Sequence, residues 1–148
     1  MSRVQLALNV SDLDLAVAFY SKLFGTGPAK VRPGYANFAV EDPPLKLVLM
    51  EDAGARGQGV AGALNHLGVE VATTDDVVAA TGRLGRQGLL TEVEEQTNCC
   101  FAIQDKVWVR DPDGAPWEVY TVLADAPSTP GTPAAHADRA TVDHASCC

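Results

Sequence analysis

The chain has 148 residues, 47% of them hydrophobic and 20% charged, which is the composition of a globular protein with one domain. Its formal net charge of −8 argues against binding to the phosphate backbone of nucleic acids and gives no support for an anionic membrane surface. No apolar run approaches the roughly 20 residues that span a bilayer. The N-terminus lacks a signal-peptide pattern, so we expect a cytoplasmic protein.

The first half of the chain predicts a strand, a helix and further strands. Gln5–Val10 alternates apolar residues with polar or small ones, as a half-buried strand does. A helix follows, with a capping pattern at Ser11 and Asp14, apolar residues at helical spacing, and Gly25 at its end. Two short strand candidates come next, Ala36–Val40 and Leu45–Met50.

The second half repeats this order, which is a sign of internal duplication. The segment His66–Val71 matches Gln5–Val10 in its alternation, and a helix begins at Thr74 or Asp75 and ends at Gly88. Three strand candidates follow, Leu90–Glu94, Lys106–Arg110 and Trp117–Val122, with a turn at Asp111–Gly114 in which Asp111 and Asp113 are turn-formers. The sequence therefore predicts an α+β fold of two βαβββ modules, about residues 1–60 and 61–124, within one domain, 1–124.

The end of the chain has a different composition. Residues 125–148 are rich in Ala, Pro, Thr, Ser and Asp and show no apolar periodicity. Such a segment cannot bury enough apolar surface to offset the entropy of ordering, so we expect a flexible tail. Its last residues, Cys147 and Cys148, are a candidate secondary site for a soft metal, with a dispensable tail as the alternative.

Three residues are candidate metal ligands. The repeat makes Gln5 and His66 equivalent, because each is the first inward residue of the first strand in its module. Glu118 lies in the last strand between Trp117 and Val119, where a carboxylate faces either water or a charged group. A single histidine in a strand is more often a core or surface residue than a ligand. The metal site is therefore predicted from the three residues together.

The order of these motifs resembles the vicinal oxygen chelate superfamily, which includes glyoxalases, extradiol dioxygenases and bleomycin- and fosfomycin-resistance proteins. The resemblance rests on the helix Ser11–Gly25, on His66 and on the segment Asp111–Glu118, and it covers nearly all of residues 1–124. It implies modules that curl into a concave mixed sheet. It also implies one divalent metal held by Gln5, His66 and Glu118.

Two positions depart from patterns found in that superfamily. Iron-dependent members usually offer two histidines and a carboxylate, whereas this chain has Gln5 in place of one histidine. Glyoxalases add a fourth ligand, a glutamate, which is expected near Leu47, where this chain has no carboxylate. The resemblance thus implies a three-ligand site with open positions. Such a site favours coordination of dioxygen or substrate over glyoxalase chemistry.

Cys99 and Cys100 form an adjacent thiol pair. Two neighbouring thiols chelate a soft ion better than one, and trivalent arsenic, cadmium and mercury are candidates. Two inert buried cysteines are the ordinary alternative. In this fold, however, the segment Thr97–Cys100 resembles the carbon–arsenic lyases, which are non-haem iron dioxygenases acting on trivalent organoarsenicals.

The second resemblance implies a function. Cys99 and Cys100 are expected to bind the substrate arsenic beside Fe(II), for which Ni, Co or Mn can substitute, with dioxygen as co-substrate. The products that the resemblance implies are arsenite and an oxidised organic fragment. The expected partner is a small-molecule organoarsenical, without nucleic acid or membrane, and the protein is expected to be a monomer or homodimer. Two alternatives stay open: a soft-metal protein that binds arsenic or cadmium without turnover, and a glyoxalase-like enzyme.

Overall fold

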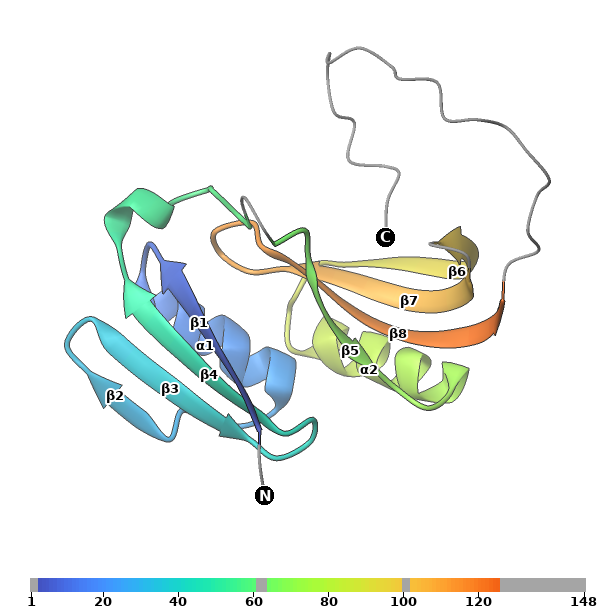
Figure 1. The fold of residues 1–148 in the computed structure, drawn as a ribbon, viewed down its shortest axis with the longest axis horizontal. Helices are drawn as coiled ribbons and strands as arrows, with labels where there is room; N and C mark the ends of the chain where they lie inside the picture. Colours follow the sequence, from blue (N-terminus) through green and yellow to red (C-terminus); the bar gives the residue numbers. More distant parts are fainter. Residues whose placement is uncertain (1–2, 61–63, 100–101, 126–148) are drawn as a thin grey trace, which may run out of the picture.

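The computed structural model describes residues 3–60, 64–99 and 102–125. These residues form two βαβββ modules, as predicted (Figure 1). The first module contains β1 (Val4–Val10), α1 (Leu13–Phe24), β2 (Lys30–Arg32), β3 (Tyr35–Val40) and β4 (Leu45–Glu51), followed by the short 3-10 helix η1 (Ala53–Ala55). The second contains β5 (Leu67–Glu70), α2 (Thr74–Arg86), β6 (Thr91–Cys99), β7 (Ala102–Arg110) and β8 (Pro116–Asp125).

Each module forms its own mixed four-stranded sheet. The strand orders are β1-β4-β3-β2 and β5-β8-β7-β6. In both sheets the first and last strands of the module pair in parallel, and the remaining pairs are antiparallel. Within the described residues no strand ladder joins the two sheets. The equivalence of the two modules therefore extends to the position of every strand.

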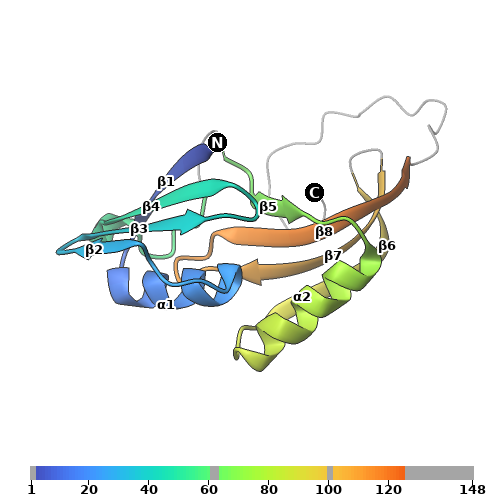
Figure 2. The same ribbon diagram turned by 90° about the horizontal axis from the view of Figure 1, so that it is seen from below.

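Both helices lie on the same side of the sheets, so the opposite face carries neither of them (Figure 2). The α1 helix begins at Asp12, whose side chain accepts a hydrogen bond from the backbone N–H of Leu15 at 2.9 Å. It ends at Gly25, as predicted, with φ of 65° in the left-handed region. Thr73 and Asp76 form a capping box at the start of α2. Neither helix in the described ranges is long and apolar enough to cross a membrane.

The helix side holds a core to which both modules contribute. The α1 aromatics Tyr20 and Phe24 meet Trp117 of β8 edge to face, with ring centroids 5.9 and 5.4 Å apart. Leu47 and Leu49 of β4 lie in the same buried cluster as Leu84, Val109 and Trp117 of the second module. The modules therefore bury one shared apolar surface.

The predicted turn after β7 also links the modules. Asp111 accepts hydrogen bonds from the N–H groups of Asp113 and Ala115, as a turn-former does, and a third from the Tyr20 hydroxyl at 2.8 Å. Asp113 accepts from the N–H of Ser11 at 2.8 Å and from its hydroxyl. Ser11 therefore binds the second module, and the predicted capping role belongs to Asp12 instead. Burial raises the pKa of Asp111 above its ordinary value.

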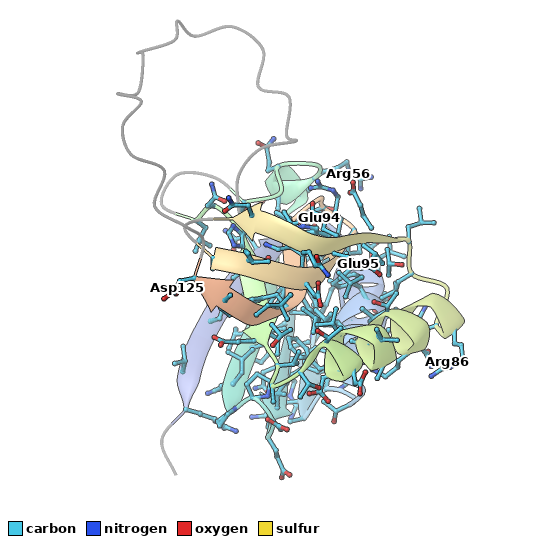
Figure 3. All side chains as sticks on the ribbon, turned by 90° about the vertical axis from the view of Figure 1, so that its right-hand side faces the viewer. Arg56, Arg86, Glu94, Glu95 and Asp125 are labelled. Atoms are coloured by element: carbon cyan, nitrogen blue, oxygen red, sulfur yellow. The ribbon has the colours of Figure 1, made fainter. Side chains whose placement is uncertain are left out.

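In the second module β5 is shorter than the predicted strand His66–Val71, whereas β6, β7 and β8 are longer than predicted. β6 includes residues 95–99 and β7 includes residues 102–105, where no strand was predicted, and Figure 3 labels Glu94 and Glu95 on β6. The pairing of these strands shifts by one residue between Glu94 and Thr97. Gln96 lies at this bulge with φ of 48°, and its N–H donates to Asp105 at 2.8 Å. Asp105 also accepts from the Thr74 hydroxyl at 2.6 Å. The predicted tail, including Cys147 and Cys148, lies outside the described residues apart from the end of β8.

Candidate metal and thiol site

Glu118 is the centre of the candidate site. It alternates along β8 with Trp117 and Val119, which belong to the core, so its side chain lies on the face without helices. Glu118 is only 5% exposed. Its two carboxylate oxygens have different partners: Oε1 lies 3.4 Å from Nε2 of His66, and Oε2 lies 2.9 Å from Nζ of Lys106. The structure therefore brings together two of the three predicted ligands.

His66 immediately precedes β5, which pairs in parallel with β8. Its Nδ1 lies 2.7 Å from the side-chain oxygen of Asn65, and its ring meets Trp108 edge to face at 5.4 Å. The Asn65 oxygen can only accept a hydrogen bond, so this contact fits the His66 tautomer that carries its proton on Nδ1. In that tautomer Nε2 turns a lone pair toward the carboxylate. Neighbours of this kind hold metal-binding histidines in a fixed orientation.

The His66–Glu118 contact fits a divalent cation. A lone pair facing a carboxylate oxygen is repulsive unless a proton or a cation lies between them. Two ligands that each bind a metal at about 2.1 Å and enclose an angle of about 109° are about 3.4 Å apart. The observed separation of Nε2 and Oε1 is 3.4 Å. The separation of these two atoms therefore matches that of two ligands on one metal ion.

Gly68 makes room for the carboxylate. It lies opposite Glu118 in the β5–β8 pair. A Cβ atom at this position would lie 2.9 Å from Cγ of Glu118 and 3.3 Å from Oε1. The contact with Cγ is too short for two carbon atoms and would displace the side chain. The absence of a side chain at Gly68 is therefore a condition for the observed position of Glu118.

Lys106 supplies the positive charge beside Glu118. It lies in β7, its side chain is fully buried, and its Nζ is 5.3 Å from the ring centroid of Trp108. A buried carboxylate needs such a partner. Neither Lys106 nor Asn65 was predicted as a site residue. The alternation of Gln104, Lys106 and Trp108 with Asp105, Val107 and Val109 was the available indication of a strand with a polar face.

The third predicted ligand, Gln5, comes from the other sheet. Gln5 is exposed in β1 of the other sheet, opposite Lys46, and within the described ranges it has no hydrogen bond to His66 or Glu118. In the same part of the chain, no three His, Cys, Asp or Glu side chains gather at one point. Leu47 faces the core, and no carboxylate occupies the neighbouring positions of β4. Ligation by Gln5 stays a prediction.

Of the predicted thiol pair, the structure describes the backbone of Cys99. Cys99 is the last residue of β6, with its backbone opposite Ala102, and Cys100 lies outside the described residues. Trp108, six residues beyond Ala102 in β7, is opposite Glu118. At about 3.4 Å per residue, this is about 20 Å of strand. Gln104 and Lys106 occupy the face between the two positions, and arsenic binding by the thiols stays a prediction.

Comparison with known proteins identifies relatives along the whole chain. The cadmium-induced protein CadI of Mycobacterium tuberculosis is 57% identical over 148 residues, which are 100% of this chain and 93% of that protein. A trivalent organoarsenical cleaving enzyme of Thermomonospora curvata is 62% identical over 126 residues, covering 85% of this chain and 81% of the enzyme. These two similar proteins have names that indicate different functions.

Solved structures agree on the fold. A glyoxalase/bleomycin resistance protein/dioxygenase from Alicyclobacillus acidocaldarius matches with a TM-score of 0.67 and 16% identity, covering 82% of this chain and 91% of that chain. A protein of the same description from Nocardioides matches with a TM-score of 0.63 and 22% identity, covering 90% of both chains. The family model described as the Glyoxalase/Bleomycin resistance protein/Dioxygenase superfamily matches residues 3–119. With its two βαβββ modules and this match, the chain belongs to the glyoxalase/bleomycin resistance protein/dioxygenase superfamily.

Proposed function

We propose that this protein is an Fe(II)-dependent dioxygenase that cleaves the carbon–arsenic bond of trivalent organoarsenicals and releases arsenite. The observation that carries the proposal is the pair of His66 Nε2 and Glu118 Oε1, 3.4 Å apart on the face without helices. The 62% identity to the organoarsenical cleaving enzyme of Thermomonospora curvata supports the substrate class. A cytoplasmic location, and a monomer or homodimer, belong to the same proposal.

His66 and Glu118 would hold the iron, with Gln5 as the third ligand. When bound, Fe(II) supplies the coordination and activation of dioxygen. Asn65 keeps the lone pair of His66 turned toward the site. Lys106 engages Oε2 of Glu118 and leaves Oε1 for the metal. The chain thus provides one imidazole, one carboxylate oxygen and one amide, and leaves coordination positions open.

Cys99 and Cys100 would hold the substrate. A trivalent organoarsenical with two hydroxyl groups reacts with two thiols to form two As–S bonds, and the thiol protons leave with the hydroxyls as two molecules of water. The carbon–arsenic bond is then the one remaining bond to arsenic. Two attachment points fix the direction of the carbon–arsenic bond. Holding a reacting bond in one orientation is a large part of catalysis, because the entropy of ordering is lost on binding and not in the reaction.

Binding of a soft metal without turnover is the second candidate function. Its support is the 57% identity to cadmium-induced protein CadI along the whole chain. The thiols would then bind arsenic or cadmium, with no need for oxygen. A glyoxalase-like activity has less support, because Lys46, Leu47 and Val48 offer no fourth carboxylate.

One experiment separates these functions. Protein loaded anaerobically with Fe(II) is mixed with a trivalent methylarsenical, oxygen is admitted, and arsenite is measured. We expect arsenite that depends on oxygen and iron and is lost in His66→Ala, Glu118→Gln and Cys99→Ser. The double variant Cys147→Ser/Cys148→Ser is the matched thiol control and should keep the activity. Arsenical binding without arsenite would favour sequestration, and absence of both would refute both candidate functions.

A further inference from the structure

Gln104 lies on the same face of the sheet as the candidate metal site and is not one of the predicted ligands. It precedes Lys106 by two residues in β7, so the two side chains project from the same face of the sheet. Gln104 pairs with Thr97 of β6 on one side and with Val122 of β8 on the other. It therefore lies between the strand end that carries Cys99 and the Glu118 carboxylate.

The Gln104 side chain is buried with an unsatisfied acceptor. The residue is 8% exposed, and its Oε1 is the buried side-chain polar atom without a hydrogen-bond partner in the described part of the chain. The neighbouring Val122 side chain has no hydrogen to donate. Folded proteins rarely leave such an acceptor unpaired, because it has lost its hydrogen bonds to water.

Other buried polar side chains nearby are satisfied. Glu118 contacts His66 and Lys106, and Asp105 accepts hydrogen bonds from Gln96 and Thr74. Gln104 thus differs from residues of similar burial on the same strands. An acceptor that is buried and unpaired on the face that carries a candidate site indicates a position where a ligand supplies the missing donor.

We propose that Gln104 is a specificity residue that accepts a hydrogen bond from a hydroxyl or amino substituent on the organic group of the arsenical. This inference rests on the proposed function. Once both hydroxyls of the arsenic are replaced by thiolates, a methylarsenical has no O–H or N–H group left. A substituted aromatic arsenical keeps one. Gln104 therefore selects among substrates by the donor at the far end of the organic group, without touching the arsenic.

The test compares two aromatic substrates that differ in one hydroxyl. Wild type, Gln104→Leu and Gln104→Met are each given a trivalent phenylarsenical and a trivalent hydroxyphenylarsenical, and KM, kcat and equilibrium binding are measured. We expect both variants to weaken binding of the hydroxyphenyl compound by about 3- to 10-fold, the size of one neutral hydrogen bond. Binding of the phenyl compound should stay within about 2-fold of wild type.

Two controls make the result specific. Gln87→Leu, at the exposed end of α2, should leave both substrates unchanged. Without ligand, Gln104→Leu should melt no lower than wild type, because it removes an unpaired acceptor. Equal changes for the two compounds, or no change for either, would overturn the role of Gln104 while leaving the cleavage reaction in place. If wild type neither binds nor cleaves either compound, the proposed function fails, and this inference fails with it.

Discussion

Replacing Gly68 with alanine should dislodge Glu118. The added Cβ would lie 2.9 Å from Cγ of Glu118, so the carboxylate must move and lose its contacts with His66 and Lys106. Breaking a buried ion pair costs about 3–5 kcal/mol. Alanine in a strand regains about 0.5–1 kcal/mol relative to glycine. The expected net loss is about 2–4 kcal/mol, or about 10 °C in the melting temperature of a domain of this size.

Thermal unfolding and Co(II) titration measure this effect. We expect Gly68→Ala to melt lower than wild type and to bind Co(II) about 10- to 100-fold more weakly, because a misplaced ligand lowers metal affinity. Gly85→Ala is the matched control, since a Cβ at Gly85 of α2 has open space around it and should slightly stabilise the helix. Unchanged melting and unchanged Co(II) affinity in Gly68→Ala would show that Glu118 does not depend on this gap.

Lys106→Met should lower the melting temperature, because Glu118 loses its buried cation. Added Co(II) should raise the melting temperature of this variant more than that of wild type, because the metal replaces the lost charge. An equal rise in both proteins would contradict the role of Lys106 as the partner of Glu118. Asp105→Asn should lower the free energy of unfolding by about 1–3 kcal/mol and speed hydrogen exchange at the Gln96 amide. The reason is that one of the two accepting oxygens becomes an NH2 group, which cannot accept a hydrogen bond. Unchanged exchange at that amide would argue against a role of Asp105 in holding Gln96. Burial raises the pKa of Asp111, so the folded state holds a proton that the unfolded state releases, and stability from this group falls as pH rises from its ordinary value of 3.8 through the folded pKa. As pH rises from about 4 to about 7, roughly the range above the ordinary pKa, Asp111→Asn should therefore gain stability relative to wild type in urea unfolding. A difference in the free energy of unfolding that does not change with pH would refute this sign.

The sequence was sufficient for the repeated order of elements because local patterns determine it. Gly25 ends α1 in the left-handed conformation, and the Asp111–Gly114 segment forms its turn, as predicted. By contrast, β2 is three exposed residues, which have no buried face and hence no alternation to detect. The extension of β6 and β7 depends on Asp105 reaching Thr74 and Gln96, a set of contacts that local sequence does not encode.

The candidate site was predictable only in part for a similar reason. The repeat and the odd carboxylate in a strand indicated His66 and Glu118, and the structure brings them together. The role of Lys106 depends on which residue of β8 it meets across the sheet, and register of this kind is a tertiary property. Gln104 became notable only once its burial and its missing partner were known.

The closure of each sheet within its own module affects how two copies of the chain can combine. The modules meet through side chains, such as Tyr20 on Trp117, and through a few hydrogen bonds, including Arg83 to the carbonyls of Lys22 and Leu23. No strand ladder in the described ranges would be cut if the second module docked on the first module of another chain. The connector itself contributes a contact, since the N–H of Gly59 donates to the carbonyl of Asp113 at 2.8 Å. In this architecture a domain swap would therefore recreate the side-chain contacts between the modules, and its cost would lie in the connector.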